Sequence, residues 1–260
     1  LKVGTTANYA NYTSKAISDG SGGTSYVSMI ATVMTLAPYI ADTYPADALP
    51  TQMQAQIANG FTLLQNANGD YYSCLGTMEQ VHPMVAIRMN DKKNTGNSLM
   101  GTLYANFTPI KDLVFTTRLG YRIATDNTYT HNNLYYGSAS ASNKDRNGVT
   151  RTSLSTTYYQ WENFVNYNTT LLDTHNISAM LGMSYSQSDQ IYVSAGVDKI
   201  AKDNLLYADV DWPAGDAVKS TGGHNYIYRK LSYFGRVGYD YKNRYMAQFA
   251  MRADAADASV

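Results

Sequence analysis

The chain has 260 residues with 20 basic and 20 acidic side chains, so its formal net charge is zero. Nothing in this balance suggests nucleic-acid binding, which would call for a basic stripe. Charged residues make up 15% of the chain, against about 25% in typical soluble domains, and 24 tyrosines far outnumber 6 phenylalanines and 2 tryptophans. Because a tyrosine ring has one wet end, this composition favours a boundary between water and lipid, as in the aromatic girdles of a membrane barrel.

The sequence contains no apolar run of the ~18 to 20 residues that a transmembrane helix needs. The most apolar helical candidate, Met29 to Ala41, is short and contains Pro38. We therefore expect the chain to cross a membrane by strands or not at all. No signal peptide is visible, and Leu1 opens directly on strand-like sequence. We therefore expect the chain to start and stop inside a longer protein.

The first predicted strand, Leu1 to Tyr12, leads into a polar connection that runs from Thr13 to about Asn97. Inside this connection, Ser25 to Ile40 and Thr51 to Leu64 have compositions compatible with short helices. We expect these helices to fold over the mouth of a barrel.

Three hairpins follow, and in each the side chains alternate with the period of two that is typical of strands with one apolar face. Turns of two to five residues join the strands of each pair. The pairs are Leu99–Phe107 with Leu113–Arg122, Tyr158–Leu171 with His175–Tyr185, and Leu231–Tyr241 with Tyr245–Arg252.

The connections between hairpins are long and polar, from Ile123 to Arg151 and from Gln187 to Arg229. Alternating short turns and long loops are typical of an outer-membrane barrel, with the turns on the periplasmic side. The predicted fold class is therefore an all-β, antiparallel transmembrane barrel. Seven strands are an odd and open set, whereas bacterial single-chain barrels have even counts. We therefore interpret residues 1–260 as a middle portion of a larger barrel, completed by other sequence.

One stretch, Leu231 to Tyr245 (LSYFGRVGYDYKNRY), resembles a segment of the SusC/RagA-like TonB-dependent outer-membrane transporters of Bacteroidetes almost throughout. Leu99–Tyr104, His175–Gly182 and Arg252–Asp254 show weaker similarities, in the family's order. After Asp254 the family usually continues with Gly-Ser-Ser and an aromatic residue, whereas this chain reads Ala255 to Val260. The family's plug domain and TonB box have no counterpart in this sequence.

The resemblance implies a plugged outer-membrane barrel of ~22 strands that imports large nutrients, oligosaccharides or peptides. A SusD-like surface lipoprotein would cap its outer mouth. TonB would pull on the plug, powered by the inner-membrane proton gradient. Such transporter–lid pairs could also assemble as dimers.

Four arginines alternate with apolar residues on the predicted strands. A charge on the lipid face would cost ~2 to 4 kcal/mol at mid-membrane, so we expect these side chains to face the lumen. There, pairing with plug carboxylates is favoured over substrate contact. They are Arg118, Arg122, Arg236 and Arg252.

Aromatic residues in the predicted extracellular loops are the best candidates for substrate contact, because sugar rings stack on aromatic faces. The alternative is that they pack loops together or contact the lid protein. They are Tyr71, Tyr72, Tyr135, Tyr136, Tyr207 and Trp212.

No cofactor and no catalytic residues are expected. None of the four histidines has a second ligand at metal-binding spacing, and we interpret His175 as structural. Clustered carboxylates such as Asp209 and Asp211 could hold calcium, although a solvated loop is the favoured interpretation. The lone cysteine, Cys74, cannot form an internal disulfide.

Two other function classes remain open at this point. A soluble secreted glycan-binding protein would fold without detergent. An outer-membrane barrel enzyme would need a Ser/His/Asp or Asp/His cluster at the extracellular rim, and the sequence suggests no such set.

Overall fold

The computed structural model describes residues 1–15, 33–34, 36, 38–75, 81–202 and 208–259. Seven long strands form one sheet in the order β1-β4-β5-β8-β9-β10-β11, and every neighbouring pair is antiparallel. This confirms the seven predicted strands and their order. Their bounds are Lys2–Lys15, Asn90–Ile110, Leu113–Asn132, Val149–Leu171, His175–Val197, Lys219–Tyr241 and Tyr245–Ser259.

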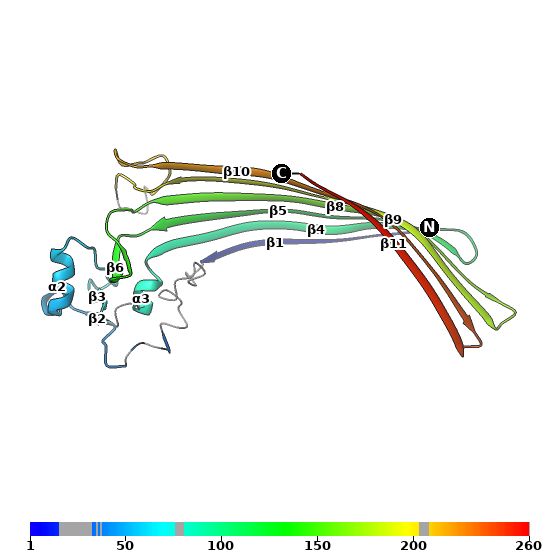
Figure 1. Cartoon of the computed structure of the whole chain (residues 1–260), viewed down its shortest axis with the longest axis horizontal. Helices are drawn as coiled ribbons and strands as arrows, with labels where there is room; N and C mark the ends of the chain where they lie inside the picture. The colour runs from blue at the N-terminus through cyan, green and yellow to red at the C-terminus, as the bar shows by residue number, and fades with distance from the viewer. Residues whose placement is uncertain (16–32, 35, 37, 76–80, 203–207, 260) are drawn as a thin grey trace.

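The sheet forms a long, bent wall whose strands run side by side (Figure 1). The tight hairpin turns lie at one end of this wall. The helices and short strands gather at the other end, which we call the loop end. Strands β1 and β11 form the two edges of the sheet.

The register divides the sheet into two faces. Odd-numbered residues lie opposite odd-numbered residues except at the turn end of β4, where the register shifts and Ile110 lies opposite Leu113; Leu119, for example, lies between Leu103 on β4 and Trp161 on β8. We call the two sides the odd face and the even face. Large apolar side chains are exposed along the middle of the odd face, as a surface destined for lipid requires. They include Leu99, Leu103, Phe107, Phe115, Leu119, Trp161, Leu181, Val237 and Phe249.

The hairpin turns use left-handed backbone. Leu172 and Asp173 both have positive φ, as do Lys242 and Asn243. Two consecutive central residues with positive φ are typical of type I′ turns, whose twist matches that of the flanking strands. These short turns set the register of the β8–β9 and β10–β11 pairs.

All three predicted long connections are shorter than the sequence suggested, and this part of the prediction was wrong. The connection predicted from Thr13 to about Asn97 contains the end of β1 and the start of β4. The stretch from Ile123 to Arg151 contains the end of β5 and the start of β8, while Gln187 to Arg229 contains the end of β9 and the start of β10. Beyond the lipid a strand no longer needs an apolar face, so the alternation fades. Backbone pairing continues there because threonine and tyrosine still favour extended structure.

The loop end contains several short elements. These are β2 (Thr43–Tyr44), a 3₁₀ turn η2 (Ala46–Ala48), α2 (Thr51–Ala58), β3 (Tyr71–Tyr72), α3 (Pro83–Ala86), β6 (Tyr135–Ser138) and β7 (Ala141–Asn143). Helix α2 confirms the prediction at Thr51, although it ends six residues earlier than expected. The helix predicted over Ser25 to Ile40 falls largely outside the described residues.

Among the described residues, none of the helices has the length and hydropathy of a membrane-spanning helix.

Aromatic rings lie over glycines on neighbouring strands. A Cβ atom built on Gly182 would lie 2.6 Å from Phe164 Cβ and 2.7 Å from the ring of Phe234. Both aromatic residues are its direct cross-strand partners. Gly182 therefore makes room for two rings on the even face, where any larger side chain would displace them.

Candidate functional site

The even face carries the four arginines predicted to face a lumen. Arg118 lies 3.6 Å from the carboxylate of Glu162, and its guanidinium lies over the ring of Phe164. Arg122 and Arg236 lie on the same face, opposite uncharged residues on both neighbouring strands. The wall therefore has one apolar and one polar side.

Arg252 on β11 is held by residues of its own strand and of the neighbouring strand β10. Its Nε donates to Asp254 Oδ1 at 2.9 Å, and its Nη2 donates to Ser232 Oγ at 3.0 Å. Its guanidinium also lies over the ring of Phe234. Arg118 and Arg252 thus find carboxylate partners within the wall itself, which the sequence prediction did not anticipate.

Four of the predicted substrate-contacting tyrosines come together at the loop end. Tyr71 and Tyr72 form β3, and Tyr135 and Tyr136 begin β6. Tyr72 is only 5% exposed and packs in a hydrophobic cluster, together with Val81, Val85, Ala86 and partly buried Tyr135.

The two tyrosines of β6, Tyr135 and Tyr136, lie in different environments. The Tyr136 ring lies 4.9 Å from the ring of Phe61. Burial raises the pKa of Tyr135 above its ordinary value. Tyr71 and Tyr136 lie closer to the surface than Tyr72, and substrate contact by this group stays a prediction.

Trp212 lies apart from these tyrosines, in the connection between β9 and β10. Trp212 is 49% exposed, and the backbone N–H of Ala201 donates a hydrogen bond to its carbonyl oxygen at 3.0 Å. Tyr207, the other aromatic predicted in this connection, falls outside the described residues. The predicted aromatic site is therefore divided between two loop regions.

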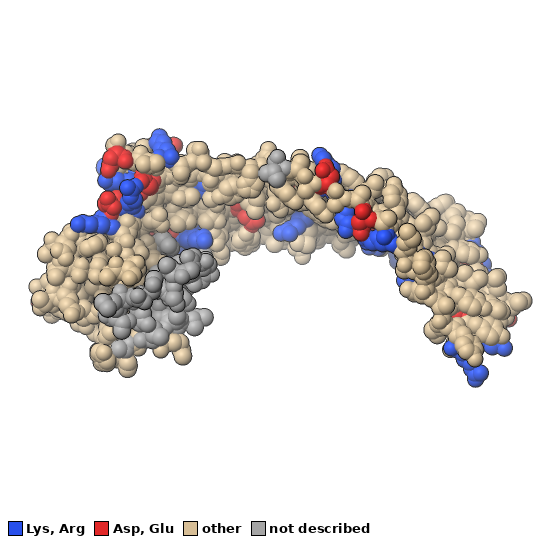
Figure 2. All heavy atoms as spheres, in the orientation of Figure 1, with Lys and Arg blue, Asp and Glu red and all other residues tan. Residues whose placement is uncertain are grey.

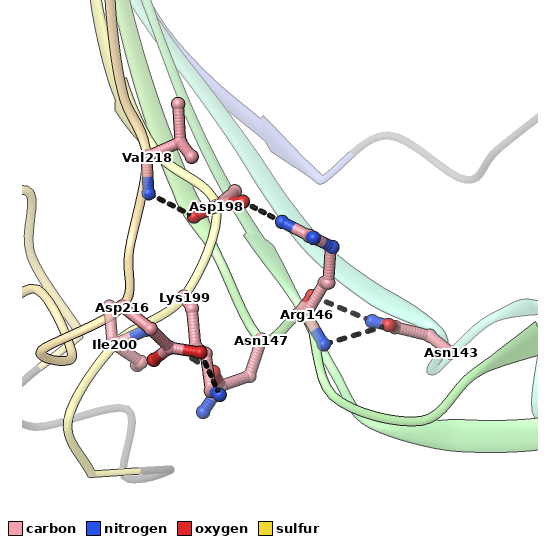
Figure 3. Close-up of polar contacts among 8 residues, drawn as sticks. All are labelled: Asn143, Arg146, Asn147, Asp198, Lys199, Ile200, Asp216 and Val218. Atoms are coloured by element: carbon pink, nitrogen blue, oxygen red, sulfur yellow. Dashed lines mark hydrogen bonds and ion pairs between the residues drawn. The ribbon is translucent and has the colours of Figure 1, made fainter.

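A set of polar contacts, shown in Figure 3, ties the β9–β10 connection to the segment before β8. Asp198 accepts a hydrogen bond from Val218 N at 2.7 Å and forms an ion pair with Arg146. The backbone N–H of Ile200 donates to Asn147 Oδ1 at 3.2 Å. These contacts hold the connection at both of its ends, close to where it leaves the sheet.

The same figure shows an ion pair within the connection, in which Lys199 Nζ lies 2.9 Å from Asp216 Oδ2. This hydrogen bond from Lys199 lowers the pKa of Asp216. Figure 2 shows the corresponding concentration of acidic and basic side chains at the loop end.

A second fastening point lies farther along the connection. Arg151 of β8 donates from Nε and Nη2 to the two carboxylate oxygens of Asp209, at 2.9 and 2.8 Å. The hydrogen bonds from Arg151 lower the pKa of Asp209. Tyr129 OH donates to Ala208 O at 2.9 Å, and its ring lies beneath the Arg151 guanidinium.

Sequence reasoning missed this pair because Arg151 and Asp209 are 58 residues apart and no local spacing links them. The guanidinium occupies both oxygens of Asp209, one of the two carboxylates considered for calcium. Within the described ranges, no group of three or more His, Cys, Asp or Glu residues could hold a metal ion.

The histidines make structural contacts. His82 Nδ1 accepts a hydrogen bond from Met84 N at 3.3 Å and so caps α3. Burial lowers the pKa of His82, despite Asp42 at 3.2 Å from its Nε2. His175 Nδ1 lies 2.7 Å from the hydroxyl of Tyr239 at the turn end, in agreement with its structural interpretation.

A bent antiparallel wall with one lipid-compatible face, one polar face, tight turns at one end and folded loops at the other defines the chain as part of a transmembrane β-barrel. Comparison with known proteins supports this class. The chain is 26% identical over 178 residues to TonB-dependent receptor P39 of Formosa agariphila, a match that covers 65% of this chain and 16% of the relative. No protein-family model matches the chain.

Solved structures share the fold. A chain of the RagAB peptide transporter matches with a TM-score of 0.59 at 18% identity, over 73% of this chain and 21% of that one. The RagAB peptide importer in its open-open state matches with a TM-score of 0.60 at 17% identity, over 98% of this chain and 25% of that one.

Together these findings confirm the resemblance to SusC/RagA-like TonB-dependent transporters. The relatives are receptors and transporters by name, and none is described as an enzyme. The chain spans about a sixth of the curated relative and about a quarter of the importer chain that it matches.

Proposed function

We propose that residues 1–260 form a middle stretch of the barrel wall of a TonB-dependent outer-membrane importer for oligosaccharides or peptides. The observation that carries this proposal is the two-faced sheet, with apolar side chains exposed on the odd face and arginines on the even face. A soluble glycan-binding protein would gain nothing from a broad exposed apolar surface, which in water promotes association.

The even face suits a lumen that is filled by a plug. Arg118 and Arg252 already have carboxylate partners on the wall. Arg122 and Arg236 lie opposite uncharged residues and point to the same side, so we assign them to carboxylates of a plug domain. TonB would act on that plug from the periplasm.

The loop end suits capture of substrate beneath a SusD-like lid. Tyr71, Tyr136 and Trp212 offer aromatic faces from two loop regions, and the polar contacts around Asp198 hold the second region in place. We assign Tyr72 a supporting role, because it packs inside the cluster beneath them. The RagAB structures are described as peptide transporters, which favours peptides among the two substrate classes.

An uptake assay tests the proposal. Cells with the intact gene and cells without it are given fluorescent oligopeptides or oligosaccharides, with and without a protonophore. We expect uptake of one substrate class to require both the gene and the proton gradient. Equal uptake by both strains, or recovery of the protein in the soluble fraction, would contradict the proposal.

The aromatic assignment has its own test within the same assay. Trp212→Ala and Tyr136→Ala should each lower uptake about tenfold, as expected for loss of an aromatic contact worth roughly 1 to 1.5 kcal/mol. Tyr72→Phe is the matched control, because it keeps the buried ring and removes only the hydroxyl. If all three variants transport like the wild type, these aromatics pack the loops and do not contact the substrate.

A further inference from the structure

A hollow of 660 Å³ opens on the odd face near the loop end, on the opposite side of the wall from the lumen face. Strands β4, β5, β8 and β9 form its floor, and the β9–β10 connection forms one side. Its lining combines cationic, hydroxyl and amide side chains with one tyrosine, one carboxylate and the apolar residues Val193, Ala195 and Ala208. The polar residues that the following argument uses are Lys93, Thr95, Asn127, Tyr129, Arg151 and Asp209.

On β4 and β5 the hollow lies beyond the apolar part of the odd face, whereas on β9 the exposed side chain of Val193 forms part of its lining. On β4 the last exposed apolar residue is Leu99, and on β5 it is Ile123. Lys93 and Tyr129 each lie about six residues farther along, which is roughly 15 Å above the apolar band at ~3.3 Å per residue and a strand tilt of ~40°. A ligand held on the β4 and β5 side of the hollow would therefore lie at the height of the sugars and phosphates that cover the membrane, with Val193 as an apolar contact on the β9 side.

The hollow has a net positive charge. Lys15, Lys93, Tyr129 and Arg151 follow one another across four strands in one row of the register. Lys15 lies directly opposite Lys93, and like charges in this position repel each other. An anion bound between them would relieve that repulsion.

Two carboxylates close to this row, Asp209 and Asp91, reduce the charge without cancelling it. Asp209 is held by Arg151. Asp91 lies 3.8 Å from the ring of His131 and accepts a hydrogen bond from Asn133 Nδ2 at 3.1 Å. Three cations therefore face two engaged carboxylates. Thr95 and Asn127 add the hydroxyl and amide groups that hydrogen-bond to sugars.

We propose that this hollow binds the anionic core saccharide of an outer-leaflet glycolipid. The inference rests on the proposed outer-membrane position, because only then does the odd face meet lipid below the hollow. Charge and polarity select an acidic or phosphorylated sugar, and the position of Lys93 and Tyr129 beyond the exposed apolar residues of β4 and β5 selects the saccharide over the acyl chains. The glycolipid would thus bind outside the barrel, away from the transport path.

The complete native protein, purified from outer membranes, tests the proposal. Binding of purified lipopolysaccharide with an intact core is measured by native mass spectrometry and compared with binding of lipid A alone. Lys93→Gln should weaken binding of the intact glycolipid about fivefold, as expected for loss of one partly exposed charged contact. Arg151→Gln provides a second variant, for which circular dichroism checks folding.

Lys92→Gln is the matched control. Lys92 precedes Lys93 on β4, and successive residues of a strand point to opposite faces, so its charge lies on the even face. We expect this variant to bind like the wild type. Equal binding by the Lys93→Gln and Lys92→Gln variants would overturn the proposal, as would equal binding of lipid A and the intact glycolipid.

The uptake assay separates this failure from failure of the proposed function. If uptake depends on the gene and the proton gradient while the Lys93→Gln variant binds glycolipid normally, the transporter assignment stands and the saccharide site is wrong. A protein recovered from the soluble fraction would overturn both.

Discussion

Replacing Leu181 by arginine tests whether the odd face meets lipid. Leu181 is 72% exposed, so its substitution removes little packing within the protein. In water such an exposed change should alter the free energy of unfolding by no more than about 0.5 kcal/mol. In a bilayer, an arginine near the midplane should cost ~2 to 4 kcal/mol. The middle of this range corresponds to about a hundredfold change in the folding equilibrium.

Asn166→Arg is the matched control for this substitution. Asn166 follows Val165, the direct cross-strand partner of Leu181, and it lies on the even face. The two variants therefore place the same charge at the same level of the wall, on opposite sides. We expect the control to cost less than about 1 kcal/mol.

The assay is reversible denaturant unfolding of the complete protein in phospholipid vesicles, followed by the fluorescence of Trp161 in β8. A Leu181→Arg variant as stable as the Asn166→Arg variant would refute the assignment of the odd face to lipid. It would also remove the main physical argument for a membrane wall.

Three further outcomes follow from local contacts. Gly182→Ala should destabilise the wall by about 1 to 3 kcal/mol, because the new methyl group would overlap Phe164 and Phe234; Gly120→Ala, with its nearest neighbour at 3.9 Å, should stay close to wild type in the same unfolding assay. Asp209→Asn should increase hydrogen exchange of the β9–β10 connection at neutral pH. Because Arg151 lowers the pKa of Asp209, the stabilisation that this ion pair gives the folded protein is complete above the pKa of Asp209 in the unfolded chain and is lost as pH falls through its lower pKa in the folded protein. Below that folded pKa, the variant and the wild type should exchange at the same rate. Burial raises the pKa of Cys74 to about 11, so at pH 8 maleimide should label it far more slowly in the folded protein than after denaturation, and equal rates would contradict this burial.

Periodicity predicted the membrane-facing part of the fold. The alternation at Leu99–Phe107 and Leu113–Arg122 follows from the need for lipid on one side and water on the other, so it is visible in the sequence. Where both sides meet water, as from Thr125 to Asn132, that requirement is absent and the strand continues without the pattern. Strand ends at the loop end could therefore not be located from periodicity.

The contacts at the loop end were harder to predict for a different reason. Arg151 and Asp209 meet through folding of a long connection, and Arg146 meets Asp198 in the same way. Neither pair has a local spacing signal. In contrast, the face of Arg118 and Arg122 was predictable, because it follows from the period of the strand alone.

The two loop regions each have a hydrophobic cluster of their own. Tyr72, Val81 and Val85 hold the first, and Val149, Val197 and Ile200 hold the second, with no residue in common among those described. The first cluster joins short elements of the loop end, whereas the second includes Val149 of β8 and Val197 of β9 and is therefore tied to the pairing of the wall. Substitutions in the first cluster can thus change the shape of the loop end while the strand pairing stays as it is, whereas substitutions at Val149 or Val197 would also disturb the wall.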